Sequence, residues 1–110
     1  MKLAIIGSRS LKNIALEQYV GVEVSEVVSG GAVGVDACAA EYAKRKGLKL
    51  TEFLPQYNRY GRAAPIVRNK EIVDYADRMI VFWDGKSKGT LSVIKYAQKK
   101  GKLCQIIYCE

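Results

Sequence analysis

Three short stretches of this sequence place glycines beside polar and basic residues directly after apolar runs. They are Gly7-Ser8-Arg9-Ser10, Ser29-Gly30-Gly31-Ala32-Val33-Gly34 and Asp84-Gly85-Lys86-Ser87-Lys88-Gly89-Thr90. Glycine lets backbone N–H groups come close to a ligand, and a helix that begins after such a turn adds partial positive charge. These residue types in these places predict an anion site, and a phosphate site in particular.

None of the three stretches matches an established nucleotide fingerprint. The G-x-G-x-x-G spacing of dinucleotide binding is absent, and no G-K-[ST] occurs at the spacing of a Walker loop. For residues 29–34 a second explanation also stands, because a tight turn from a strand into a helix favours glycine without any ligand. The sequence leaves both the anion site and the turn requirement open for this stretch.

Three polar residues lie in helical patterns next to these turns. Asp36 falls in the first turn of a helix expected over 35–46, where its carboxylate either complements the helix dipole or bonds across the turn. In a second helix, expected over 64–76, Asn69 falls in the middle of the apolar arc. It therefore needs a hydrogen-bond partner, either a loop backbone or a ligand. Arg68, at the edge of that arc, is placed to bind phosphate or to make a surface ion pair.

Aromatic and basic side chains alternate in the segment that precedes the second helix. This segment, residues 55–62, contains Tyr57, Arg59, Tyr60 and Arg62. Aromatic rings stack on nucleobases, and guanidinium groups pair with phosphates. Tyr57, Tyr60 and Trp83, which lies just before the third glycine stretch, are the predicted contacts to a base.

Composition and charge exclude several classes of protein. The chain has 110 residues and 49% hydrophobic content, typical of one globular domain. It has no histidine, so zinc sites and histidine-based triads are nearly excluded, and no metal site is predicted. No apolar run suits a signal peptide or a membrane span, which predicts a cytoplasmic protein without membrane contact.

Cysteines and basic residues have ordinary explanations. Cys38, Cys104 and Cys109 lie in segments expected to be buried and show no C-x-x-C spacing, which favours free core thiols. The net charge of +7 permits an anionic partner such as nucleic acid or phosphate. However, several basic residues fall near expected helix C-termini, which favours a solvated surface.

The chain alternates apolar runs with helical patterns, which predicts a parallel sheet with right-handed crossovers. Strands are expected near residues 3–6, 22–28, 48–54, 79–83 and 103–108, and helices near 11–20, 35–46, 64–76 and 90–100. We expect one α/β domain over residues 1–110, a Rossmann-like three-layer α/β/α sandwich with five strands in the order 3-2-1-4-5. In such a sheet a ligand binds outside the carboxyl ends of the strands, where the order switches between strands 1 and 4.

Four motifs in this order resemble those of the SLOG superfamily. They are Gly7-Ser8-Arg9, Ser29-Gly30-Gly31-Ala32-x-Gly34-x-Asp36, Tyr60-Gly61-Arg62-x-Ala64-x-x-x-Arg68-Asn69 and Lys88-Gly89-Thr90. The superfamily includes the LOG phosphoribohydrolases, the DNA-processing protein DprA/Smf and small stand-alone YspA/YpsA-like proteins, to which this chain is most similar. The resemblance implies a Rossmann-like fold, a nucleotide-derived ligand and a homo-dimer or higher homo-oligomer. It places ligand contacts at Gly7, Ser8, Arg9, Ser29, Gly30, Gly31, Gly34, Arg68, Asn69, Gly89 and Thr90.

Two departures from the family pattern bear on activity. Val33 stands where the second motif often has arginine. Val93 stands where the LOG hydrolases have the glutamate of P-G-G-x-G-T-x-x-E. An aliphatic side chain cannot exchange a proton, so hydrolysis by the LOG route is doubtful and no catalytic residue is assigned.

The sequence favours the binding or sensing of a nucleotide-like phosphate ligand and requires no other cofactor. One alternative is a nucleotide-processing enzyme of the phosphoribohydrolase type, for which Asp36 and Asp84 are the carboxylates nearest the expected cleft. Another is a DprA-like protein that binds single-stranded nucleic acid through basic and aromatic side chains. In the binding interpretation, Asp36 and Asp84 support the loops.

Overall fold

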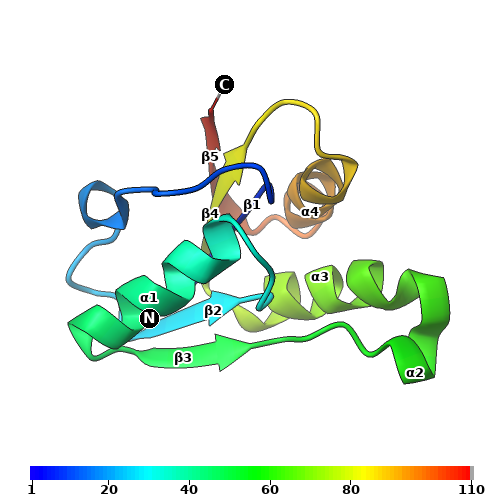
Figure 1. Ribbon diagram of the computed structural model, residues 1–110, viewed down its shortest axis with the longest axis horizontal. Coiled ribbons are helices and arrows are strands. Elements are labelled where there is room, and N and C mark those ends of the chain that lie inside the picture. Colours follow the sequence, from blue (N-terminus) through cyan, green and yellow to red (C-terminus); the bar gives the residue numbers. More distant parts are fainter. Residues whose placement is uncertain (110) are drawn as a thin grey trace.

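Five strands form one parallel sheet in the order β3-β2-β1-β4-β5, as the sequence predicts (Figure 1). The computed structural model describes residues 1–109. The strands are β1 (Lys2–Gly7), β2 (Glu26–Ser29), β3 (Lys49–Glu52), β4 (Arg78–Trp83) and β5 (Leu103–Tyr108). Because β1 pairs with both β2 and β4, their carboxyl ends lie side by side at one edge of the sheet.

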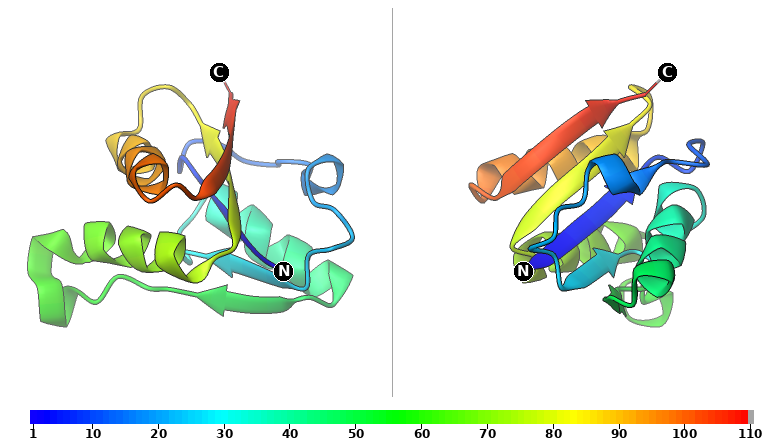
Figure 2. Two further views of the ribbon diagram at one scale, coloured as in Figure 1. Left: turned by 180° about the vertical axis from the view of Figure 1, so that it is seen from behind. Right: turned by 90° about the vertical axis from the view of Figure 1, so that its left-hand side faces the viewer.

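Helices cover both faces of the sheet, so the fold is a Rossmann-like α/β sandwich (Figure 2). The helices are α1 (Val35–Lys46), α2 (Tyr57–Tyr60), α3 (Ala64–Tyr75) and α4 (Lys88–Lys99), with 3₁₀ turns at Leu16–Gln18 and Gly61–Ala63. Helix α1 packs on one face, and α3 and α4 pack on the other.

Alternate residues of the central strands supply the two halves of the core. Leu3 and Ile5 of β1 face α1, whereas Ala4 and Ile6 face α3 and α4. All four are buried, because helices or loops cover both sides of the strand. This explains why β1 has a continuous apolar run rather than an alternating pattern.

The helix predicted near residues 11–20 is wrong. That segment forms only the 3₁₀ turn Leu16–Gln18, and Asn13 has a positive φ of 55°, which a regular helix excludes. Leu16 is buried and Tyr19 packs edge-to-face on Phe82, so a few anchors hold the segment on the sheet. An extended cover of this kind leaves no helical period in the sequence.

Other boundaries differ in smaller ways. Strand β2 begins at Glu26 rather than near residue 22, since Val22 is fully exposed in a turn. The segment 55–62, for which no regular structure is predicted, contains α2 and the start of the 3₁₀ turn Gly61–Ala63. Helix α4 begins at Lys88, because Ser87 caps it by accepting a hydrogen bond from the Thr90 N–H at 3.2 Å.

The sequence predicts free thiols inside the core. All three cysteines are free, but they lie half-buried at the margin of the core. Among the described residues, no helix has the length and apolar character needed to cross a membrane.

Candidate functional site

A cleft of about 410 Å³ opens at the carboxyl ends of β1, β2 and β4. Residues from α1, α3 and α4 and from the loops after these three strands line it. Nine of the residues predicted for the site are in its wall, namely Gly7, Arg9, Gly30, Asp36, Arg68, Asn69, Asp84, Gly89 and Thr90. The crevice therefore lies where the strand order reverses, which is the usual ligand position in open α/β sheets.

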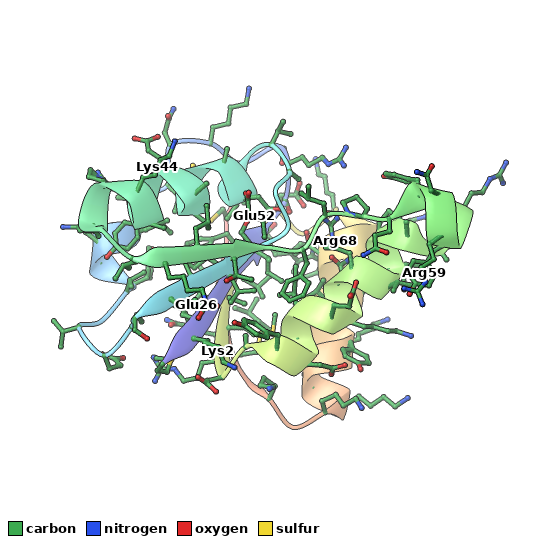
Figure 3. The ribbon with its side chains drawn as sticks, turned by 90° about the horizontal axis from the view of Figure 1, so that it is seen from below. Lys2, Glu26, Lys44, Glu52, Arg59 and Arg68 are labelled. Atoms are coloured by element: carbon green, nitrogen blue, oxygen red, sulfur yellow. The ribbon has the colours of Figure 1, made fainter. Side chains whose placement is uncertain are left out.

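Arg68 is the central cation of this cleft. Although it comes from α3, it reaches the loop after β2, where Nη1 donates to the Gly30 carbonyl at 2.7 Å (Figure 3). Its Nε donates to Asn69 Oδ1 at 2.9 Å. Within residues 1–109, Nη2 donates to no protein atom, so the guanidinium is fixed in place and keeps donors available.

Burial changes the interpretation of this helix. Arg68 is only 9% exposed and forms no surface ion pair with the described residues, so that alternative is wrong. Asn69 is half-buried and bonds Arg68, a partner that neither alternative included. Ile66 is 49% exposed, because the start of α3 lies beyond the end of the sheet (Figure 1). The buried face of α3 therefore includes Arg68 and Ile72 but not Ile66.

Asp36 lies beside Arg68 in the cleft wall. Its Oδ2 accepts a hydrogen bond from the Ala32 N–H at 3.2 Å, which confirms the predicted bond across the turn. Burial raises the pKa of this carboxyl above its ordinary value of 3.8, while the Ala32 N–H and the Arg68 charge act in the opposite direction. Burial also lowers the pKa of Arg68, but arginine still carries its charge at neutral pH.

Two glycines of the second stretch have separate physical reasons. A Cβ on Gly30 would lie 2.7 Å from Arg68 Nη1 and 2.9 Å from Asp36 Oδ2, so glycine permits their close approach. Gly34 has a φ of 75°, and a Cβ there would lie 2.6 Å from the Arg9 carbonyl oxygen. The turn requirement therefore explains Gly34, whereas Gly30 makes room for two charged groups in the cleft.

Hydrogen bonds join the loops after β1 and β4. Asp84 Oδ1 accepts from the Lys86 and Ser87 N–H groups at 2.8 Å each, and its Oδ2 accepts from Ser10 Oγ at 2.8 Å. Ser8 is buried below them, and its Oγ accepts from the Asp84 N–H at 3.2 Å. These bonds fix the start of α4 against the end of β1.

The same bonds predict how stability depends on pH. They hold the pKa of Asp84 well below its ordinary value of 3.8, chiefly through the Ser87 and Lys86 N–H groups. The folded state therefore binds this proton less readily than the unfolded chain. The stabilisation is complete above pH 3.8 and is lost as the pH falls below it. We expect the free energy of unfolding of Asp84→Asn to fall less steeply with acid than that of the wild type.

Urea unfolding at a series of pH values between 7 and 2.5 measures this difference. Glu41→Gln, at an exposed position of α1, is the matched control and should follow the wild-type slope. Equal slopes for wild type and Asp84→Asn would contradict the assigned hydrogen bonds.

The predicted aromatic contacts are placed elsewhere. Tyr57, Tyr60 and Trp83 are not among the described residues that line the cleft. Tyr57 is exposed on α2, Tyr60 packs against Arg59, and Trp83 donates from Nε1 to the Ser87 carbonyl at 3.1 Å. Trp83 therefore stabilises the third glycine stretch through this hydrogen bond and does not provide a stacking surface for a base.

A second hollow, of about 520 Å³, adjoins the cleft and is lined in part by an aromatic side chain that the sequence reasoning missed. The hollow shares Ser10 and Asp84 with the cleft, and Tyr108 at the end of β5 lies in its wall. An aromatic residue at the carboxyl end of a strand was the available signal. The sequence pattern predicts Tyr108 only as part of the apolar strand near residues 103–108.

The remaining predicted residues support the loops. Ser29 is buried, and its Oγ accepts from the Gly31 N–H at 3.4 Å. Ser8, Ser29, Gly31 and Gly34 do not appear among the described wall residues of the cleft. Residues 1–109 contain no group of three His, Cys, Asp or Glu side chains placed to hold a metal ion.

Sheet order, helix placement and the position of the cleft together define a Rossmann-like α/β protein. No protein-family model matches the chain, and comparison with curated proteins gives no match either. The functional proposal therefore depends on the chemistry of the cleft.

Proposed function

We propose that this protein binds or senses a nucleotide or a nucleotide-derived phosphate ligand in the cleft, as its resemblance to the small SLOG-like proteins implies. One observation carries the proposal. The buried Arg68 and the first turn of α4, which come from different crossovers of the sheet, border the same cavity. An anion placed between them would meet a guanidinium on one side and a helix N-terminus on the other.

The start of α4 is suited to phosphate. Thr90 N–H is already bonded to Ser87, but the N–H groups of Lys88 and Gly89 precede the first intrahelical bonds. Free N–H groups and the helix dipole favour an anion there. A Cβ on Gly89 would meet no atom within 4 Å, so this side of the helix is open space.

The same cleft supports binding rather than glycosidic hydrolysis. Val93 lines the cavity at the position of the LOG glutamate and cannot transfer a proton. Both oxygens of Asp84 accept hydrogen bonds from the protein, and its pKa is depressed, so it is a poor general acid. A volume of about 410 Å³ is within the range of small-molecule sites.

Gly89 allows binding to be separated from folding. Gly89→Asp places a carboxylate in the first turn of α4. There the negative charge interacts favourably with the helix dipole, but the side chain occupies the proposed phosphate position. We expect the variant to be at least as stable as the wild type and to lose the thermal stabilisation by nucleotides. Gly89→Ala adds a methyl group without a charge, so it should gain roughly 0.5–1 kcal/mol of stability and keep more of the stabilisation by nucleotides than Gly89→Asp does.

Thermal unfolding across a panel of ribonucleotides and deoxyribonucleotides, followed by calorimetry of the best ligand, tests this proposal. A ligand at a hundred times its Kd should stabilise the wild type by about 2.7 kcal/mol. A folded wild type with no shift across the panel, or a Gly89→Asp variant that binds normally, would count against it. The sequence also leads us to expect a homo-oligomer and a cytoplasmic location. Light scattering of the purified protein tests the first expectation, and cell fractionation tests the second.

A further inference from the structure

Asp36 is a buried acid in the cleft wall whose hydrogen bonding is incomplete. Asp36 is only 6% exposed to solvent. Oδ2 accepts from the Ala32 N–H at 3.2 Å, whereas Oδ1 is buried without a partner among the described residues. Most buried polar atoms in native proteins are hydrogen-bonded, so an exception in the wall of a cavity requires an explanation.

The other acid in the wall differs in this respect. Both oxygens of Asp84 already accept hydrogen bonds from Ser10, Lys86 and Ser87. Of the two acids that line the described cleft, Asp36 is therefore the one with an unfilled acceptor.

Asp36 also lies next to the principal cation. A Cβ on Gly30 would be 2.9 Å from Asp36 Oδ2 and 2.7 Å from Arg68 Nη1, so both groups pack against this glycine, and both line the cleft. A ligand whose phosphate binds Arg68 would therefore hold its neighbouring atoms close to Asp36.

A second phosphate oxygen does not suit that place. Phosphate oxygens are mainly acceptors at neutral pH, and a carboxylate repels them. A hydroxyl group both donates and accepts, so it complements Asp36 in either protonation state. Burial raises the pKa of Asp36, and a hydroxyl can bond to the neutral acid as well as to the carboxylate.

The geometry points to Asp36 as the residue that binds a sugar hydroxyl of the ligand, so that the cleft selects a hydroxyl-bearing sugar phosphate over phosphate alone. The inference rests on the proposed phosphate binding and adds a specificity-determining residue to it.

Calorimetry with ribose 5-phosphate and with inorganic phosphate tests the inference on the full chain. We expect the wild type to bind ribose 5-phosphate about tenfold more tightly than phosphate. Asp36→Ala should remove this preference without weakening phosphate binding. Asp36→Asn removes the charge at nearly constant size, so it should bind phosphate more tightly than the wild type and show a reduced preference.

Glu52→Gln is the matched control, because Glu52 is an exposed acid whose charge acts on Asp36 but which is not in the described wall. It should keep the preference for ribose 5-phosphate. Thermal unfolding reports whether each variant folds. If Asp36→Ala does not fold, the comparison of Asp36→Asn with the wild type decides the result.

The outcomes separate this inference from the proposed function. If nucleotides stabilise the wild type but ribose 5-phosphate is not preferred to phosphate, the role of Asp36 is wrong and phosphate binding stands. The same holds if a folded Asp36 variant weakens both probes equally. If neither probe binds and the nucleotide panel gives no shift, the proposed function fails as well.

Discussion

Replacing Arg68 with alanine should lower the affinity for a phosphate-bearing ligand by about a hundredfold, roughly two charge-assisted hydrogen bonds at a factor of ten each. Arg68 is held by Gly30 and Asn69 before any ligand arrives, so little side-chain entropy is lost on binding. Calorimetry with the best nucleotide of the panel measures the change. The variant also leaves the buried Gly30 carbonyl unpaired, which should reduce the free energy of unfolding by about 1–3 kcal/mol.

Two further variants separate geometry from charge. Arg68→Lys keeps the positive charge but loses the planar fork, so it should recover only part of the affinity. Arg62→Ala removes one charge from an exposed neighbouring position and should bind nearly as the wild type does. Equal losses for Arg62→Ala and Arg68→Ala would show that net charge, rather than the cleft, attracts the ligand.

Alanine at Gly34 should be among the most destabilising single substitutions in the chain, with a loss of roughly 3 kcal/mol or more. Its φ of 75° and ψ of −128° suit glycine, and the added Cβ would meet backbone atoms of Arg9 at 2.6–2.9 Å. Backbone atoms cannot move away without displacing the loop after β1. Chemical denaturation gives the free energy of unfolding directly.

Gly30→Ala, four residues earlier, is the informative comparison. Its Cβ would meet the ends of two side chains, Arg68 and Asp36, rather than backbone atoms, so a shift of these side chains relieves the contact. We expect a loss of about 1 kcal/mol in stability, because the bond from Arg68 to the Gly30 carbonyl weakens, and at least a tenfold loss in ligand affinity. If Gly34→Ala proves as mild as Gly30→Ala, the strained turn assigned to Gly34 is wrong.

Agreement between sequence and structure is closest where one face or a whole strand is buried. The run Leu3–Ile6 and the helical period over 35–46 predicted β1 and α1, because burial on a sheet requires a regular apolar pattern. Alternation of such patterns then determined the parallel sheet and its strand order, since right-handed crossovers leave few topologies. Agreement fails at residues 11–20, where isolated anchors replace a periodic face.

The sequence by itself determined the fold class and the position of the three glycine stretches at the strand ends. It also indicated Arg68 as a candidate phosphate-binding residue. Only the tertiary structure decided that Arg68 is buried on the Gly30 carbonyl and that Asp36 keeps an unfilled acceptor beside it. It also decided that Tyr108 lines a hollow that shares Ser10 and Asp84 with the cleft. Sequence periodicity specifies which face of an element is apolar. It does not specify how a helix such as α3 is placed against the loops of other crossovers, and that placement brings Arg68 to the Gly30 carbonyl.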